Sequence, residues 1–199
     1  MTRISLLFIF AATAATAVVP RFFALGFTHI LPNGPDHILF ILALFFLSRN
    51  FGVLLSQMTL FTLAHSLTLG LALYGIVSVP TAVVEIAIAL SIAFVAIENL
   101  FQDRLSRWRP FLVFSFGLIH GLGFAHSFQE MPLHAGDFLP ALFSFNMGIE
   151  FGQLAVVGLA YLALAIWGRR EEGFKMIARP ASTLIALTGI YWAIQRGVA

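Results

Sequence analysis

The chain has 199 residues, of which 60% are hydrophobic and only 10% charged, and its mean hydropathy is +0.95. Soluble domains are about 45–50% apolar and about 25% charged, so the composition excludes a water-soluble globule, a disordered chain and a fibrous protein. The lack of cysteine excludes a disulfide scaffold. We therefore expect an integral membrane protein whose first partner is the lipid bilayer.

Residues 1–19 can be interpreted in two ways. Arg3 precedes an apolar run that ends in Ala-Thr-Ala, a pattern typical of a cleaved signal peptide. The same residues can form a short first transmembrane helix. Residues 20–199 contain no linker or low-complexity tract and are expected to form a single transmembrane helical domain.

Six further apolar segments are long enough to cross about 30 Å of hydrocarbon as helices. Because these runs are continuous rather than alternating, they predict an all-α polytopic transmembrane bundle of six or seven spans and not a β-barrel. Pro32, Gly34 and Pro35 are expected to break the second span, since proline removes a backbone donor and glycine permits irregular backbone. The predicted spans are 22–47, 51–75, 79–101, 110–128, 138–167 and 180–196.

The 11 Lys and Arg residues, together with a pI of about 9.5, could suggest a nucleic-acid partner, but they form no run. Apart from Arg21 and Arg196, these residues lie near the N-terminus or in the loops that follow the spans 22–47, 79–101 and 138–167. Because cytoplasmic loops are rich in Lys and Arg, the N-terminus and these three loops are predicted to be cytoplasmic. The expected location is the cell (inner) membrane, crossed several times, with no nucleic-acid partner.

Polar side chains inside the predicted spans carry the functional information. A carboxylate at mid-bilayer costs roughly 2.5–3.5 kcal/mol even on a lenient scale, so these groups should face one another, water or a bound cation. A rise of about 1.5 Å per residue places one set near the bilayer centre: Asp36, His37, His65, His120 and Glu150. His29, Glu85 and His126 are expected nearer the outer face, and Glu98 near the cytoplasmic end. This polar column is what a translocation path requires.

Local spacings add to this picture. Asn146, Glu150 and Gln153 share one helical face. Two small-xxx-small pairs, Gly117 with Gly121 and Gly148 with Gly152, flank His120 and Glu150. Such pairs let helices approach closely, either as plain packing or to bring those two polar residues together. The stretch at 29–37 is a candidate ion site on a broken helix, or else a proline kink capped by its aspartate.

The chain resembles the HupE/UreJ membrane proteins, which accompany hydrogenase and urease clusters and are regarded as nickel or cobalt permeases. The resemblance rests on GFTHILPNGPDHILFILAL at 26–44, FTLAHSLTL at 61–69, VEIAIALSIAFVAIEN at 84–99, FGLIHGLGFAH at 116–126 and FNMGIEFGQL at 145–154. It implies that the metal-pathway motif falls on His29, Asp36 and His37. The family's intramembrane acid matches Glu150, with Glu98 as the alternative. A cleavable signal at the N-terminus is also implied.

The ligand types independently favour a divalent transition metal. Imidazole and carboxylate suit Ni²⁺, Co²⁺, Zn²⁺ and Fe²⁺, whereas Cu(I) prefers sulfur ligands, which here are five scattered methionines and no cysteine. Ligand types do not choose among these divalent ions, but the family resemblance implies Ni²⁺ as the expected ion, either as transported substrate or as bound ion. The phosphate-binding motif G-x-x-x-x-G-K-[ST] is missing from the sequence, so no nucleotide is expected and transport is passive or ion-coupled.

Three functions remain open from sequence. The first is a nickel permease. Its metal residues would be His29, Asp36, His37, His65, Glu98, His120 and Glu150, and a secondary pathway would use Glu85, His126, Asn146 and Gln153. The second is an intramembrane zinc-dependent hydrolase, because several histidines and a carboxylate around Zn²⁺ and water can cleave amides or esters. The third is a metal sensor or assembly factor. Partners beyond the metal, either a second copy or metalloenzyme maturation proteins, are left open.

Overall fold

The computed structural model describes residues 18–102, 105–129, 135–167 and 171–198. Within these ranges every regular element is an α-helix, apart from a 3-10 turn at Ala135–Asp137, and no strand occurs. The prediction of an all-helical polytopic protein is confirmed. The predicted signal peptide or first span lies almost entirely outside the described residues.

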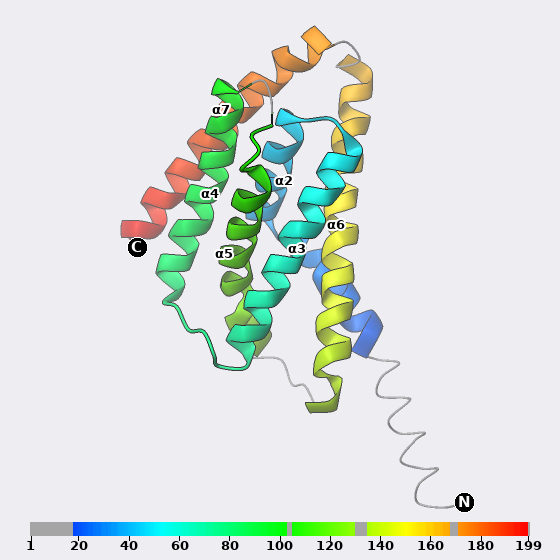
Figure 1. Ribbon diagram of the computed structural model, residues 1–199, viewed down its shortest axis with the longest axis vertical. Helices are drawn as coiled ribbons and strands as arrows, with labels where there is room; N and C mark the ends of the chain where they lie inside the picture. Colours follow the sequence, from blue (N-terminus) through cyan, green and yellow to red (C-terminus); the bar gives the residue numbers. More distant parts are fainter. Residues whose placement is uncertain (1–17, 103–104, 130–134, 168–170, 199) are drawn as a thin grey trace, which may run out of the picture.

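Successive helices alternate in direction from α2 to α7 (Figure 1). A helix at Val18–Ile30 comes first. The helices that follow are α2 (Pro35–Leu47), α3 (Phe51–Leu73), α4 (Thr81–Phe101), α5 (Arg109–Gln129), α6 (Phe138–Trp167) and α7 (Glu171–Val198).

Four helices, α3, α4, α6 and α7, are long and apolar enough to cross a membrane, and the bent pair Val18–Ile30 with α2 makes a fifth candidate. The apolar part of α5, Arg109–Ala125, is shorter. The expected total of six or seven spans depends further on α5 and on residues 1–17, which are not described, so that number stays a prediction.

The second predicted span is broken, as the prolines and glycine indicate. The two halves meet at 66°, and α2 restarts with Gly34 as N-cap and Pro35 in its first turn. Gly34 has a φ of −107°, so the position does not need glycine for left-handed backbone. It needs glycine for space, because a Cβ there would lie 2.1 Å from the carbonyl oxygen of His29.

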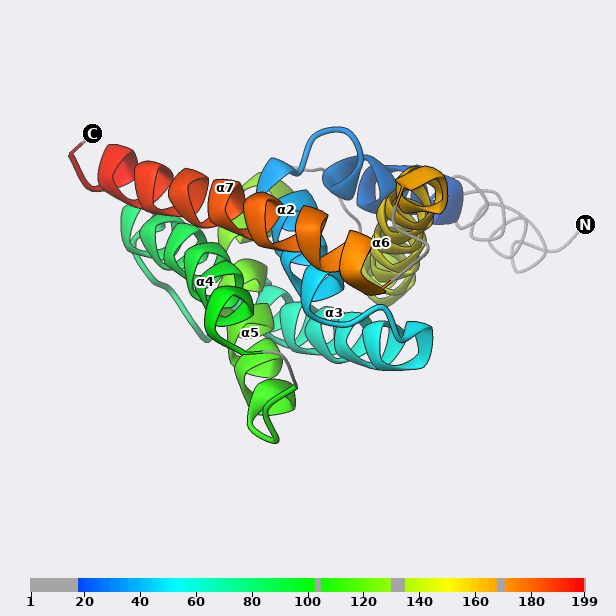
Figure 2. The same ribbon diagram turned by 90° about the horizontal axis from the view of Figure 1, so that it is seen from above.

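Helix α2 occupies the centre of the bundle. It contacts α3, α4, α6 and α7, and Figure 2 shows it between α7 and α3. A helix that is apolar on every side is expected to be buried, and Phe40, Ile41, Leu44 and Phe45 are almost fully enclosed. The start of α2 therefore lies deep in the protein, together with the polar residues it carries.

Glycines set the closest helix contacts. A Cβ on Gly117 or Gly121 would lie 2.5 or 2.2 Å from backbone oxygens of α3, and one on Gly148 would lie 2.1 Å from the carbonyl oxygen of Phe23. The two small-residue pairs thus pack on different partner helices. They seat α5 on α3 and α6 on the helix Val18–Ile30, and do not join His120 to Glu150.

The last helix is longer than its predicted span of 180–196. Helix α7 begins at Glu171 and carries Pro180 inside it. Proline is tolerated within membrane helices where neighbouring groups satisfy the freed backbone. The part of α7 toward the C-terminus packs beside α4 (Figures 1 and 2).

Candidate metal site

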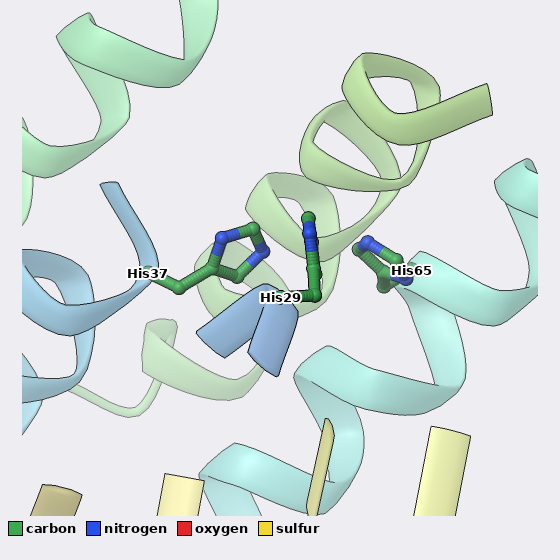
Figure 3. Close-up of side chains that lie close together, drawn as sticks. All are labelled: His29, His37 and His65. Carbon is green, nitrogen blue, oxygen red and sulfur yellow. The ribbon is translucent and has the colours of Figure 1, made fainter. Parts of the chain in front are cut away.

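Three histidines from three different helices converge in the interior. His29 comes from the end of the first described helix, His37 from the first turn of α2, and His65 from the middle of α3. One ligand nitrogen from each lies within 4.8 Å of those of the other two. Figure 3 shows the three rings facing one another, with His29 between His37 and His65. We call these residues the histidine cluster.

The bend in the second span is what brings His29 into this cluster. A straight helix over 22–47 would place His29 more than two turns from His37, and the depth estimate accordingly put it near the outer face. The separation from His37 that this estimate implied is wrong, because the chain turns by 66° between the two residues. The rings of His29 and His37 have centroids only 4.7 Å apart.

His120 lies beside the cluster, with its ring centroid 5.0 Å from that of His37. Gly121, the next residue on α5, packs closely against the carbonyl oxygen of His65, and this contact places His120 at the level of the cluster. Ser91 of α4 lies 3.0 Å from His120 Nε2 and donates its hydroxyl proton to the carbonyl oxygen of Ile88 at 2.7 Å. The serine oxygen therefore accepts a proton from Nε2, which leaves Nδ1 of His120 with a lone pair for a ligand.

The histidines sit among phenylalanine rings rather than among polar partners. Phe124 packs 4.2 Å from the His29 ring, and Phe61 lies 5.0 Å from that of His120. His65 is fully buried, and neither of its ring nitrogens has a hydrogen-bond partner among the described residues. The same holds for Nε2 of His29 and His37 and for Nδ1 of His120. Each such atom costs about 1–3 kcal/mol, a cost that coordination of a cation would offset.

A cavity of about 170 Å³ is lined by two members of the cluster, His29 and His37, and by charged side chains. Histidine rings from three elements line it, together with Asn33 from the break in the second span. Asp36, Glu85 and Arg196 also line it, and Glu85 is half-exposed. Imidazole nitrogens and carboxylate oxygens therefore line one cavity.

Asp36 does not stand free in this cavity. Nη2 of Arg196 donates to both of its carboxylate oxygens, at 3.0 and 3.1 Å. Sequence reasoning missed Arg196 because it counted the residue only as a charge on the outer side. One signal was available: Arg196 and Glu85 were both expected on the outer side, and opposite charges within or beside membrane spans tend to pair.

The other predicted residues lie apart from the cluster. Glu98 pairs with Arg109 at 2.6 Å, and both side chains are buried. Glu150 lies beside the side chains of Thr59 and Thr62 of α3, and is not among the residues whose ligand atoms converge. Thr62 also donates to the buried Gln153, and Asn146 donates to the carbonyl oxygen of Leu142. The side chain of His126 lies outside the described residues.

Comparison with protein families matches residues 7–196 to the model described as HupE / UreJ protein. This chain belongs to the HupE/UreJ family. The match covers all but the last two described residues and confirms the resemblance that the sequence motifs indicated. No curated protein and no solved structure matches the chain.

Membership in this family bears on what the histidine cluster can bind. The family consists in general of nickel and cobalt transporters. The four or five candidate membrane spans agree with a multi-pass membrane protein. Two of the three motif residues, His29 and His37, lie in the histidine cluster, and the third, Asp36, lies on the same cavity.

Proposed function

We propose that this protein is a permease for a divalent transition metal, with Ni²⁺ as the expected ion. The observation that carries the proposal is the convergence of ligand nitrogens from His29, His37 and His65. His65 is fully buried, and the other two histidines line a cavity that carboxylates also line. Asp36 and Glu85 attract the hydrated ion, and the histidine cluster, with His120 beside it, replaces its water.

The ligand set suits such an ion. Imidazole nitrogens bind Ni²⁺, Co²⁺ and Zn²⁺ well. Two nitrogens that share a metal at about 2.1 Å can be no more than about 4.2 Å apart. The nitrogens of the cluster lie within 4.8 Å, so small side-chain rotations bring them into range. Neutral ligands hold a divalent ion without neutralising it, which favours the release that transport needs.

The remainder of the ion path is proposed from the polar residues that the sequence places within the spans. Glu98 is the exit ligand, reached when its ion pair with Arg109 opens. Glu150, Asn146, Gln153 and His126 are secondary positions. Arg49, Arg107, Lys175 and Arg179 lie at one end of the bundle, near the start of α3, α5 and α7. By the positive-inside rule that end is cytoplasmic, which makes the opposite end the side of uptake.

Membership in a transporter family favours transport over the intramembrane hydrolase considered from sequence. The path needs no nucleotide, and the sequence has no Walker motif. Movement down a gradient or coupled to another ion is therefore proposed.

The substitution His65→Phe tests the proposal. A phenyl ring keeps the ring volume and packs against Phe61 and Phe145, which already contact His65, but it supplies no ligand nitrogen. We expect ⁶³Ni uptake in cells that express the variant to fall at least about tenfold, the lower bound seen even for outer-shell partners of metal sites. The unfolding temperature of the purified protein should stay equal or rise, because two unpartnered buried nitrogens are removed.

Thr183→Val is the control, since it removes an exposed hydroxyl on α7 without changing side-chain volume. It should leave uptake and stability at the wild-type level. Full uptake by His65→Phe, or a loss of stability without a loss of uptake, would show that His65 has a structural role and would contradict the proposal.

A further inference from the structure

The mouth of the cavity already holds a cation, the guanidinium of Arg196. Its Nη2 donates to both oxygens of Asp36, its Nη1 donates to the carbonyl oxygen of Glu85 at 3.0 Å, and its Nε lies 3.9 Å from Oε2 of Glu85. The ring of Trp192, one turn earlier on α7, lies 5.3 Å from the guanidinium carbon. The group is thus held from three elements.

These contacts occupy the ligand atoms that an arriving metal ion would need. Both carboxylate oxygens of Asp36 point to Arg196 rather than to His37, its neighbour in the chain. The two acids and one guanidinium leave one net negative charge at the mouth. That charge attracts a divalent ion, while both oxygens of Asp36 are already bonded to Arg196.

The position of Arg196 allows it to leave. The residue lies in the last turn of α7, and helix ends open at lower free energy than helix centres. Its side chain is 21% exposed and that of Asp36 24%, so water can solvate both groups when they separate. An ion pair at such exposure shifts an equilibrium only modestly.

We propose that Arg196 is an access gate that competes with the metal ion for Asp36 and Glu85. The divalent ion takes the carboxylates when Arg196 swings away, and only then passes to the histidine cluster. This inference rests on the proposed permease function and adds to it a residue that sets the apparent affinity. Because the binding-competent form is the open one, the measured Kd is the intrinsic Kd divided by the open fraction.

The test is calorimetric titration of the purified full-length protein with NiCl₂. Arg196→Met keeps the length of the side chain and removes its charge, so the carboxylates become available. We expect the Kd to fall about fivefold, the factor by which an exposed ion pair of ordinary strength shifts a two-state equilibrium. The control Arg179→Met removes one positive charge from an exposed site on the same helix and should leave the Kd unchanged.

Asp36→Asn tests whether the effect passes through Asp36. In that background Arg196→Met should no longer tighten binding through Asp36, so the gain should shrink to less than half of its wild-type size. Arg196→Lys keeps the charge but loses the planar fork, and its Kd should lie between those of wild type and Arg196→Met. This variant decides the question if Arg196→Met does not fold.

The outcomes separate the gate from the permease. If the wild type binds Ni²⁺ and neither Arg196 variant binds it more tightly, the gate is overturned and the permease stands. If no protein in the set binds Ni²⁺, Co²⁺ or Zn²⁺, both are overturned. Equal tightening by Arg179→Met also overturns the gate, because the effect would then come from net charge alone.

Discussion

Ring nitrogens decide what the interior of this protein can bind. Five nitrogens of four buried or half-buried histidines have no hydrogen-bond partner among the described residues, and the rings around them are phenylalanines. His120 differs, because Ser91 holds its Nε2. That single hydrogen bond selects the tautomer in which Nδ1 is the free ligand atom.

Ser91→Ala is the prediction at this scale. Loss of the hydroxyl frees the His120 ring to turn and to change tautomer, so Ni²⁺ affinity should fall about tenfold, as for other outer-shell partners. Ser66→Ala is the matched control, since Ser66 also donates to a backbone carbonyl of its own helix, that of Thr62, and makes no hydrogen bond to a histidine in the described part of the chain. Equal affinities for the two variants in a NiCl₂ titration would remove Ser91 from the site.

Helix contacts are set by a few glycines, and each contact positions a ligand. Gly121 lets α5 approach α3 at the level of His65, and Gly148 seats α6 on the helix that carries His29. Gly34 keeps the break in the second span tight against the carbonyl oxygen of His29. Backbone that packs this closely cannot accept a methyl group without moving a helix.

Gly148→Ala is therefore expected to destabilise the protein by about 1–3 kcal/mol, the usual cost of overpacking. It should also weaken Ni²⁺ binding, because the helix that ends at His29 must shift. Gly158→Ala on the same helix is the control: a Cβ there meets no atom within 4 Å, so the change should be neutral or stabilising by up to about 1 kcal/mol. Thermal unfolding in detergent measures both, and similar values for the two variants would contradict the packing argument.

At the scale of the whole molecule, the end that carries most of the basic residues is tied together by buried polar contacts. Arg109 of α5 pairs with Glu98 of α4, and both are nearly inaccessible. The neighbouring Asn99 donates to the carbonyl oxygen of Ala43 and to the hydroxyl of Ser182. Four helices thus meet there through polar groups, while the opposite end holds the carboxylates of the cavity mouth.

Glu98→Gln should destabilise the protein by about 3–5 kcal/mol, since it leaves the buried guanidinium of Arg109 without a counter-charge. The double variant Glu98→Gln with Arg109→Met should recover most of that loss, because replacing both charges removes the desolvation cost as well. Denaturant or thermal unfolding of the three proteins checks this. A double variant no more stable than the single one would show that the pair contributes more than charge balance.

Much of this architecture follows from sequence, because it depends on local properties. Hydropathy over about 20 residues identifies a membrane helix whatever it packs against. Two prolines and a glycine within four residues, Pro32, Gly34 and Pro35, disturb the helical backbone through local effects. Buried ionisable groups are costly in any fold, so the list of polar residues was also available. Among those residues His29, His37 and His65 do converge.

Only the tertiary structure decided which polar groups meet. The 66° bend joined His29 to His37, the end of α7 delivered Arg196 to Asp36, and the packing of α6 left Glu150 with threonines of α3 instead of the histidines. The physical reason is that one sequence pattern specifies how deep a residue lies on its helix. The rotation of each helix about its axis, and the distance to its neighbours, are set by side-chain packing summed over the whole bundle.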